Sequence, residues 1–154
     1  MEVVKTRIEK FKTSKDARPP IPQETIEMLY QVSNGEIRYI FKRLSDIICE
    51  FRATFPSERN IPEQIAKKSL HNLAERKLDA LNLTVREREV LKKMSSEKSF
   101  RIRDYSKFGY NKPQPMQNLV SKFLRLGLLR RVERSMREVY YSTAGDVNLV
   151  FRHS

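Results

Sequence analysis

Residues 112–125 place polar side chains on one helical face and apolar side chains on the other. Apolar residues recur every three or four positions from Met116 to Leu124, which predicts a helix with one buried face. Amides on the opposite face can pair with the edge of an adenine base, and basic or hydroxyl side chains can bind phosphates. The amides expected to contact bases are Gln114, Gln117 and Asn118. The residues expected to contact phosphates are Lys112, Ser121, Lys122 and Arg125.

A basic hairpin is predicted directly after this helix. Pro115 is expected at the first helical position, where a missing N–H costs nothing, and Gly127 is expected to end the helix. Two antiparallel strands follow at 128–133 and 139–142, joined by a basic tip at 134–137. A polar helix followed by a basic hairpin resembles the winged helix-turn-helix, a fold that binds double-stranded DNA. The hairpin residues expected to reach the flanking backbone or minor groove are Arg131, Arg134 and Arg137.

The charge of the chain is concentrated around this helix and hairpin. The 154 residues carry a formal net charge of +12, and the pI is about 10.0. Residues 83–154 contain 16 Lys/Arg and 7 Asp/Glu, whereas residues 1–82 contain 15 and 12. This distribution favours a polyanion as the partner, and the resemblance to a winged helix implies that the polyanion is double-stranded DNA.

Several classes of protein are disfavoured by the same composition. No apolar run approaches the roughly 18 residues that a membrane-spanning helix needs, and the polar start does not resemble a signal peptide. A single cysteine, Cys49, excludes an intramolecular disulfide and is expected to be a buried structural thiol. His71 and His153 lack a nearby Cys or carboxylate pattern, so no metal site is predicted. We therefore expect a cytoplasmic, nucleoid-associated protein with no membrane partner.

The elements that precede the polar helix complete a second predicted domain. Thr84 and Glu87 have the spacing of a capping box, so a helix is expected to begin immediately after Thr84. A short strand at 100–102 and a short helix at 103–108 are expected next. The order helix, strand, helix, helix, strand, strand is that of a winged helix, and it assigns residues 83–154 to a DNA-binding domain of this type.

A small helical bundle is predicted for residues 1–73, and 74–82 are expected to form a helical linker. Its four helices are expected near 4–11, 23–32, 36–51 and 62–73. The residues of the fourth helix expected to face inward are Ile65, Ala66, Leu70 and Leu73. The fold class predicted for the whole chain is therefore mainly α, with one short β-hairpin.

The bundle carries one short motif, Gly35-Glu36-Ile37-Arg38, at the start of its third helix. The motif, the helices around it and the winged helix that follows resemble the C-terminal part of archaeal AAA+ ATPases of the origin-recognition initiator type. Residues 1–73 correspond to the helical lid of these ATPases. The resemblance implies that Arg38 is the lid arginine, called sensor 2, which reaches the terminal phosphates of ATP. It also implies a role in DNA replication, with ATP and Mg as cofactors of a longer parent protein.

The phosphate-binding core of such an ATPase is not found in this sequence. A P-loop needs Gly-x-x-x-x-Gly-Lys-Ser/Thr, and none of the four glycines, at 35, 109, 127 and 145, belongs to such a motif. No acidic strand end for magnesium is recognised either. We therefore expect no enzymatic activity and no cofactor in this chain. The expected partners are double-stranded DNA and, in a parent protein or complex, an AAA+ core domain or other subunits.

Two other functions remain open at the level of the sequence. The winged helix can serve as a protein-docking or oligomerisation module, because such domains also bind proteins through this face. Alternatively, the chain can be a transcription regulator whose N-terminal bundle is a dimerisation or effector domain. For the four-residue motif itself, the alternative is that Arg38 is an ordinary surface residue in the first turn of a helix.

Overall fold

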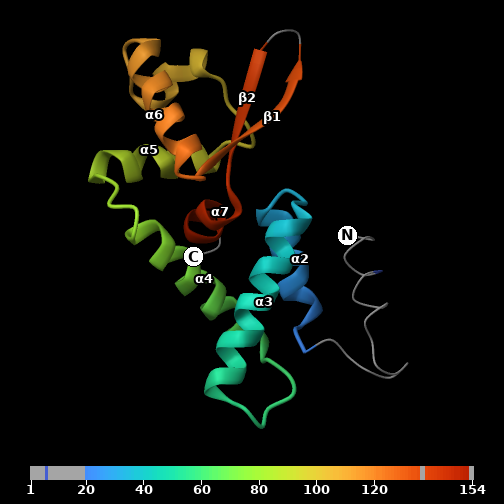
Figure 1. Cartoon of the computed structure of the whole chain (residues 1–154). Helices are drawn as coiled ribbons and strands as arrows, with labels where there is room; N and C mark the ends of the chain where they lie inside the picture. The colour runs from blue at the N-terminus through green and yellow to red at the C-terminus, as the bar shows by residue number, and fades with distance from the viewer. Residues whose placement is uncertain (1–5, 7–19, 136–137, 153–154) are drawn as a thin grey trace. The chain divides into compact units, whose positions relative to one another are not determined.

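The computed structural model describes residues 6, 20–135 and 138–152, which form a mainly helical chain with one small antiparallel sheet (Figure 1). The first predicted helix, near 4–11, lies outside the described residues except for Thr6. The chain divides into two compact units, residues 1–73 and residues 74–154. Helix α4 runs through the boundary between them.

The first unit contains α2 (Gln23–Val32), α3 (Ile37–Thr54) and the first part of α4 (Glu63–Asp79). The predicted bounds of α2 and the predicted start of α3 are confirmed. The side chains at the centre of this core are Ile26, Leu29, Ile40, Ile47 and Leu70. Gly35 turns the chain between α2 and α3 with a φ of +79°, and its N–H donates to the Tyr30 carbonyl at 2.9 Å.

Two burial predictions for the first unit are wrong. Ile65 is 37% exposed, because the buried stripe of α4 runs through Ala66 and Leu70 and a neighbouring position lies about 100° away around the helix. Cys49 is also exposed, since the stripe of α3 passes through Ile47 and Phe51 and position 49 falls between them on the solvent side. The other predicted inward residues of α4 are buried or, for Leu73, half-buried.

The second unit begins with the last turns of α4. Residues 74–79, assigned to a linker from the sequence, are part of this helix, and Ala74 and Leu78 are buried. The remaining elements are α5 (Val85–Ser96), the 3₁₀ helix η1 (Ile102–Phe108), α6 (Pro113–Arg125), β1 (Leu129–Ser135), β2 (Glu138–Thr143) and α7 (Gly145–Arg152). The largest side chains without solvent exposure in these elements and their connections are Leu91, Met94, Met116, Phe123 and Leu128.

The start of α5 is confirmed in detail, whereas the start of α6 differs from the prediction. Thr84 accepts a hydrogen bond from the Glu87 N–H, and the Glu87 carboxylate accepts one from the Thr84 N–H, which forms the predicted capping box. Pro113, rather than Pro115, occupies the first position of α6. The backbone of Lys112 is extended, as expected for a residue before proline, so Lys112 belongs to the loop and the helix begins after it.

The hairpin pairs β1 with β2 in antiparallel register, with Leu129 opposite Thr143 and Arg131 opposite Tyr141. The pairing is irregular between Val132 and Ser135. An isolated bridge joins Phe100 to Tyr141, so the strand predicted at 100–102 is reduced to a single pair on the outer side of β2. The predicted end of α6 is confirmed, since Gly127 follows it with a φ of +68°.

Polar contacts attach the helices of the second unit to one another. Arg88 of α5 forms ion pairs with Glu75 at 2.5 Å and Asp79 at 2.7 Å, both on the last turns of α4. Lys77 pairs with the buried Asp146 of α7 at 2.6 Å. Arg152 donates to the Ser95 carbonyl near the end of α5, where helical carbonyls lack partners within the helix. These contacts hold α4, α5 and α7 together, and α6 and the hairpin belong to the same unit.

Candidate functional site

The outer face of α6 is exposed along its whole length. The exposed residues there are Gln114, Gln117, Asn118, Ser121 and Arg125, and the preceding Lys112 is exposed as well. The opposite face is buried through Met116, Leu119, Val120 and Phe123, as the sequence pattern predicts. Gln114 donates to the Asn118 side-chain oxygen at 3.2 Å, so these two amides lie together one turn apart. Donors and acceptors from three amides are thus directed to solvent.

Lys122 differs from the other predicted phosphate-binding residues. Its ammonium group lies 2.6 Å from the Glu87 carboxylate at the start of α5, and the Lys122 side chain is 40% exposed. The hydrogen bond from Lys122, followed by that from the Thr84 N–H, lowers the pKa of Glu87. Because its charge is balanced within the protein, Lys122 has less positive charge to offer an anion than Lys112 or Arg125.

An open groove of about 690 Å³ lies beside α6, between the starts of α5 and α6. Among the residues that line it are Arg86, Glu87, Tyr110, Lys112, Pro115, Asn118, Leu119 and Lys122. The Arg86 guanidinium lies over the Tyr110 ring, 5.5 Å from its centroid, which is within the range of a cation–π contact. Sequence reasoning did not single out Arg86 or Tyr110. The capping box predicts the helix start that carries Arg86, but the sequence gives no signal for its contact with Tyr110.

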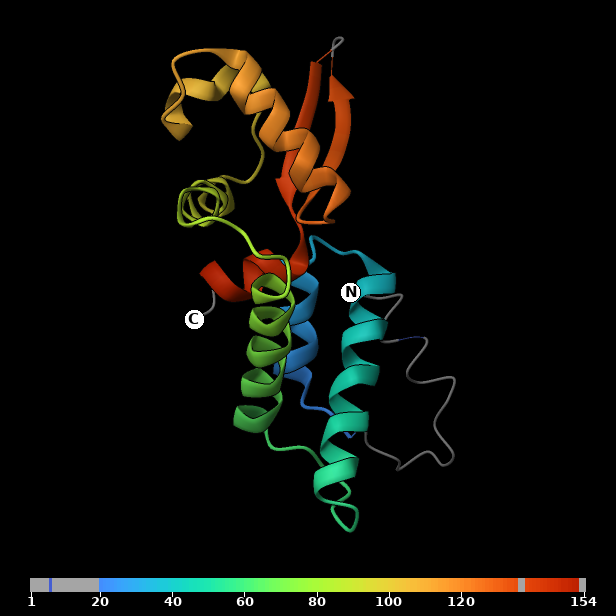
Figure 2. The same cartoon turned by 60° about the vertical axis from the view of Figure 1, so that its left-hand side comes forward.

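The hairpin supplies a second group of basic residues. Arg131 of β1 is exposed, whereas its neighbour Arg130 is half-buried and donates to the Ser142 hydroxyl at 3.2 Å. Arg134 lies in β1, but its side chain falls outside the described part of the structure, as does the whole of Arg137. In both views of the chain, the end of α6 approaches β1 while its start lies on the side of η1 (Figures 1 and 2).

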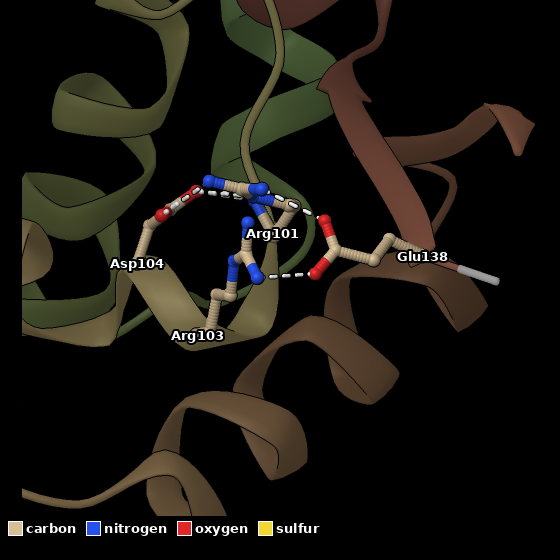
Figure 3. A network of polar contacts seen from close by, with 4 residues as sticks. All are labelled: Arg101, Arg103, Asp104 and Glu138. Atoms are coloured by element: carbon tan, nitrogen blue, oxygen red, sulfur yellow. Dashed lines mark hydrogen bonds and ion pairs between the residues drawn. The ribbon is translucent and has the colours of Figure 1, made fainter. Parts of the chain in front are cut away.

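A network of four charged residues holds the hairpin against η1 (Figure 3). Glu138, the first residue of β2, pairs with Arg101 at 2.7 Å and with Arg103 at 2.5 Å. Asp104 accepts hydrogen bonds from the backbone N–H and the guanidinium of Arg101. Burial opposes ionisation of Asp104, but these bonds outweigh it and lower the pKa of this carboxyl. The Arg101 guanidinium also lies over the Tyr140 ring.

Arg38 lies in the first unit, in the first turn of α3, and its side chain is exposed. It follows Glu36, whose extended backbone caps the helix, and Gly35 with its positive φ. Nearby on the same helix, Arg43 is buried, with its guanidinium 2.9 Å from Asp46 and over the Tyr39 ring. Arg43 is therefore part of the packed structure, whereas the side chain of Arg38 is exposed to solvent.

The described residues contain no group of three or more His, Cys, Asp and Glu side chains that could hold a metal ion. In the same part of the chain, no helix is both long and apolar enough to cross a membrane. Comparisons with family models, curated proteins and solved structures give no match for this chain.

Proposed function

We propose that residues 83–154 form a winged helix that binds double-stranded DNA, with α6 as the helix that enters the major groove. The observation that carries this proposal is the exposed outer face of α6, where three amides are accompanied by Lys112 and Arg125. The order of the elements supports it, since α5, the Phe100 bridge, η1, α6 and the two strands follow one another as in a winged helix.

The side chains of this face can form hydrogen bonds with bases and also contact the phosphates of the DNA backbone. An α-helix fits the major groove, where Gln and Asn can form paired hydrogen bonds with adenine. Phosphate contacts from Lys112, Arg125 and Arg131 would fix the position of the helix without selecting a sequence. We assign the same role to Arg134 and Arg137 at the hairpin tip. The concentration of positive charge in residues 83–154 favours such contacts.

For the first unit, we propose the lid of an initiator-like AAA+ ATPase, as the resemblance of residues 1–73 implies. Arg38 would then contact the terminal phosphates of ATP bound by a core domain of a longer parent protein. Its exposure at the start of α3 is compatible with this role, since a guanidinium donates several hydrogen bonds to phosphate oxygens and keeps its charge. The coding sequence upstream of residue 1, in the same reading frame, should encode a P-loop motif. Its absence there would contradict this assignment.

Duplex binding by the full chain, measured at several salt concentrations, tests the proposed function. About four to six phosphate contacts predict a slope of about −4 to −5 in a plot of log K against log salt, because each contact releases counterions. Fluorescence anisotropy with a labelled duplex of random sequence measures this slope. Absence of duplex binding at low salt, or binding that salt does not weaken, would contradict the proposal and favour a protein-docking role.

A further inference from the structure

The lining of the open groove between the starts of α5 and α6 includes Lys112 and Asn118 from the outer face of α6, and it continues to Arg86 and Tyr110, which that face does not contain. We propose that this groove is a second backbone-binding site for DNA, which holds one phosphodiester strand at the end of α6 remote from the hairpin. Arg86 and Lys112 contact the phosphates. This inference rests on the proposed function and adds Arg86, which the sequence pattern did not indicate, to the phosphate-binding residue Lys112.

The charges that line the groove favour an anion. Glu87 is the carboxylate among the lining residues, and Lys122 neutralises it at 2.6 Å. The positive charges of Arg86 and Lys112 are therefore not balanced by another lining residue. The Tyr110 ring supports the Arg86 guanidinium from one face and leaves its N–H donors at the edge available to phosphate oxygens.

The shape of the groove favours a strand over a compact ligand. Small-molecule sites usually bury about 70–90% of the ligand surface, whereas this groove is open to solvent along its length. The exposed Pro115 of α6 gives it apolar surface on which a deoxyribose can pack, and Asn118 adds a polar group. An extended chain of alternating sugars and phosphates matches this arrangement of apolar and cationic lining.

The spacing of the two basic groups also suits a duplex. Lys112 directly precedes α6, and Arg86 is the second residue of α5. The hairpin follows the other end of α6 (Figure 2). A helix of 13 residues is about 20 Å long, while the major groove of DNA is about 12 Å wide. Cations at the two ends of α6 can therefore contact phosphates on the two sides of the major groove into which α6 inserts.

Replacement of Arg86 by Gln tests the groove in the full chain. Arg86 is exposed on α5, so the fold should persist, and circular dichroism checks this. Arg86→Gln should lower the magnitude of the salt slope by about 1 and weaken binding to all duplexes alike. Arg86→Gln combined with Lys112→Gln should lower it by about 2. The matched control is Lys92→Gln, which removes one charge from an exposed position of α5 outside the groove and should leave the slope unchanged.

The outcomes separate the groove from the proposed function itself. If the wild-type chain binds duplex with the expected salt dependence, and Arg131→Gln in the hairpin lowers the slope, the DNA-binding role stands. If that result is obtained and the Arg86→Gln and Lys92→Gln variants still have equal salt slopes, the groove is not a backbone-binding site. Absence of salt-dependent duplex binding by the wild-type chain would overturn both proposals.

Discussion

Glu87 performs two functions with one carboxylate, because it closes the capping box of α5 and pairs with Lys122 of α6. The capping contact is visible in the sequence as a spacing of three residues. The contact with Lys122 joins positions 35 residues apart and depends on how α5 and α6 pack. The sequence pattern therefore predicts phosphate binding by Lys122 but not its ion pair with Glu87.

The ion pair between Glu87 and Lys122 makes stability depend on pH. The pKa of Glu87 is lowered from its ordinary value of 4.5, so its contribution is present above that value and is lost as the pH falls through the lowered pKa. Glu87→Gln keeps an oxygen for the capping box but removes the charge. It should lower the free energy of unfolding by about 0.5–1 kcal/mol near neutral pH, the range of a partly exposed pair.

Urea unfolding followed by circular dichroism, at about pH 7 and at the lowest pH at which the chain stays folded, measures this dependence. The difference between wild type and Glu87→Gln should shrink at the acidic pH, because the wild-type carboxyl takes up a proton as the pH falls through its lowered pKa. Glu89→Gln, at an exposed position of the same helix, is the matched control and should show little loss at either pH. An equal loss for Glu87→Gln at both pH values would show that the charge is not what stabilises the contact.

At the scale of the elements, Glu138 fixes the hairpin to η1 through Arg101 and Arg103. Removing its charge with Glu138→Gln should lower stability by about 1 kcal/mol, because two arginines lose a partly buried partner. The loss should be local and should increase opening of the hairpin. The N–H of Tyr141, which donates to the Phe100 carbonyl at 2.8 Å, should then exchange faster with solvent.

Amide hydrogen exchange resolved to single residues reports this opening directly. Faster exchange is expected at Tyr141, while the interior of α3 in the other unit should exchange as in the wild type. Glu89→Gln again provides the charge-matched control. Unchanged protection of Tyr141 in Glu138→Gln would mean that apolar packing, including the contact of its ring with Phe100, is sufficient to hold the hairpin.

The elements were largely predictable because their signals are local. Periodic apolar residues define α2, α3 and α6, and the capping box defines the start of α5. The wrong burial predictions at Ile65 and Cys49 arise because one or two positions along a helix change the direction of a side chain by 100–200°. With Pro113 and Pro115 both able to occupy a first turn, the pattern did not decide which one begins α6.

At the scale of the whole molecule, charge and amide content can be read from the sequence, whereas the boundaries of the groove cannot. The charge excess of residues 83–154 and the amides of α6 are properties of the sequence itself. The groove is different, because it forms only when the start of α5, Tyr110 and the start of α6 come together. Such a site depends on tertiary packing, so no spacing of residues along the chain predicts it.

Base reading by the outer face of α6 is the central claim, and two variants measured on two duplexes test it most directly. A preferred duplex is first selected from random sequences with the wild-type full chain. Gln117→Ala should then weaken binding to the preferred duplex by about 1–3 kcal/mol and leave binding to a random duplex nearly unchanged. Arg131→Ala should weaken both duplexes alike and reduce the salt slope by about 1. Equal weakening of both duplexes by Gln117→Ala, or failure of any preferred sequence to emerge, would contradict base recognition by α6.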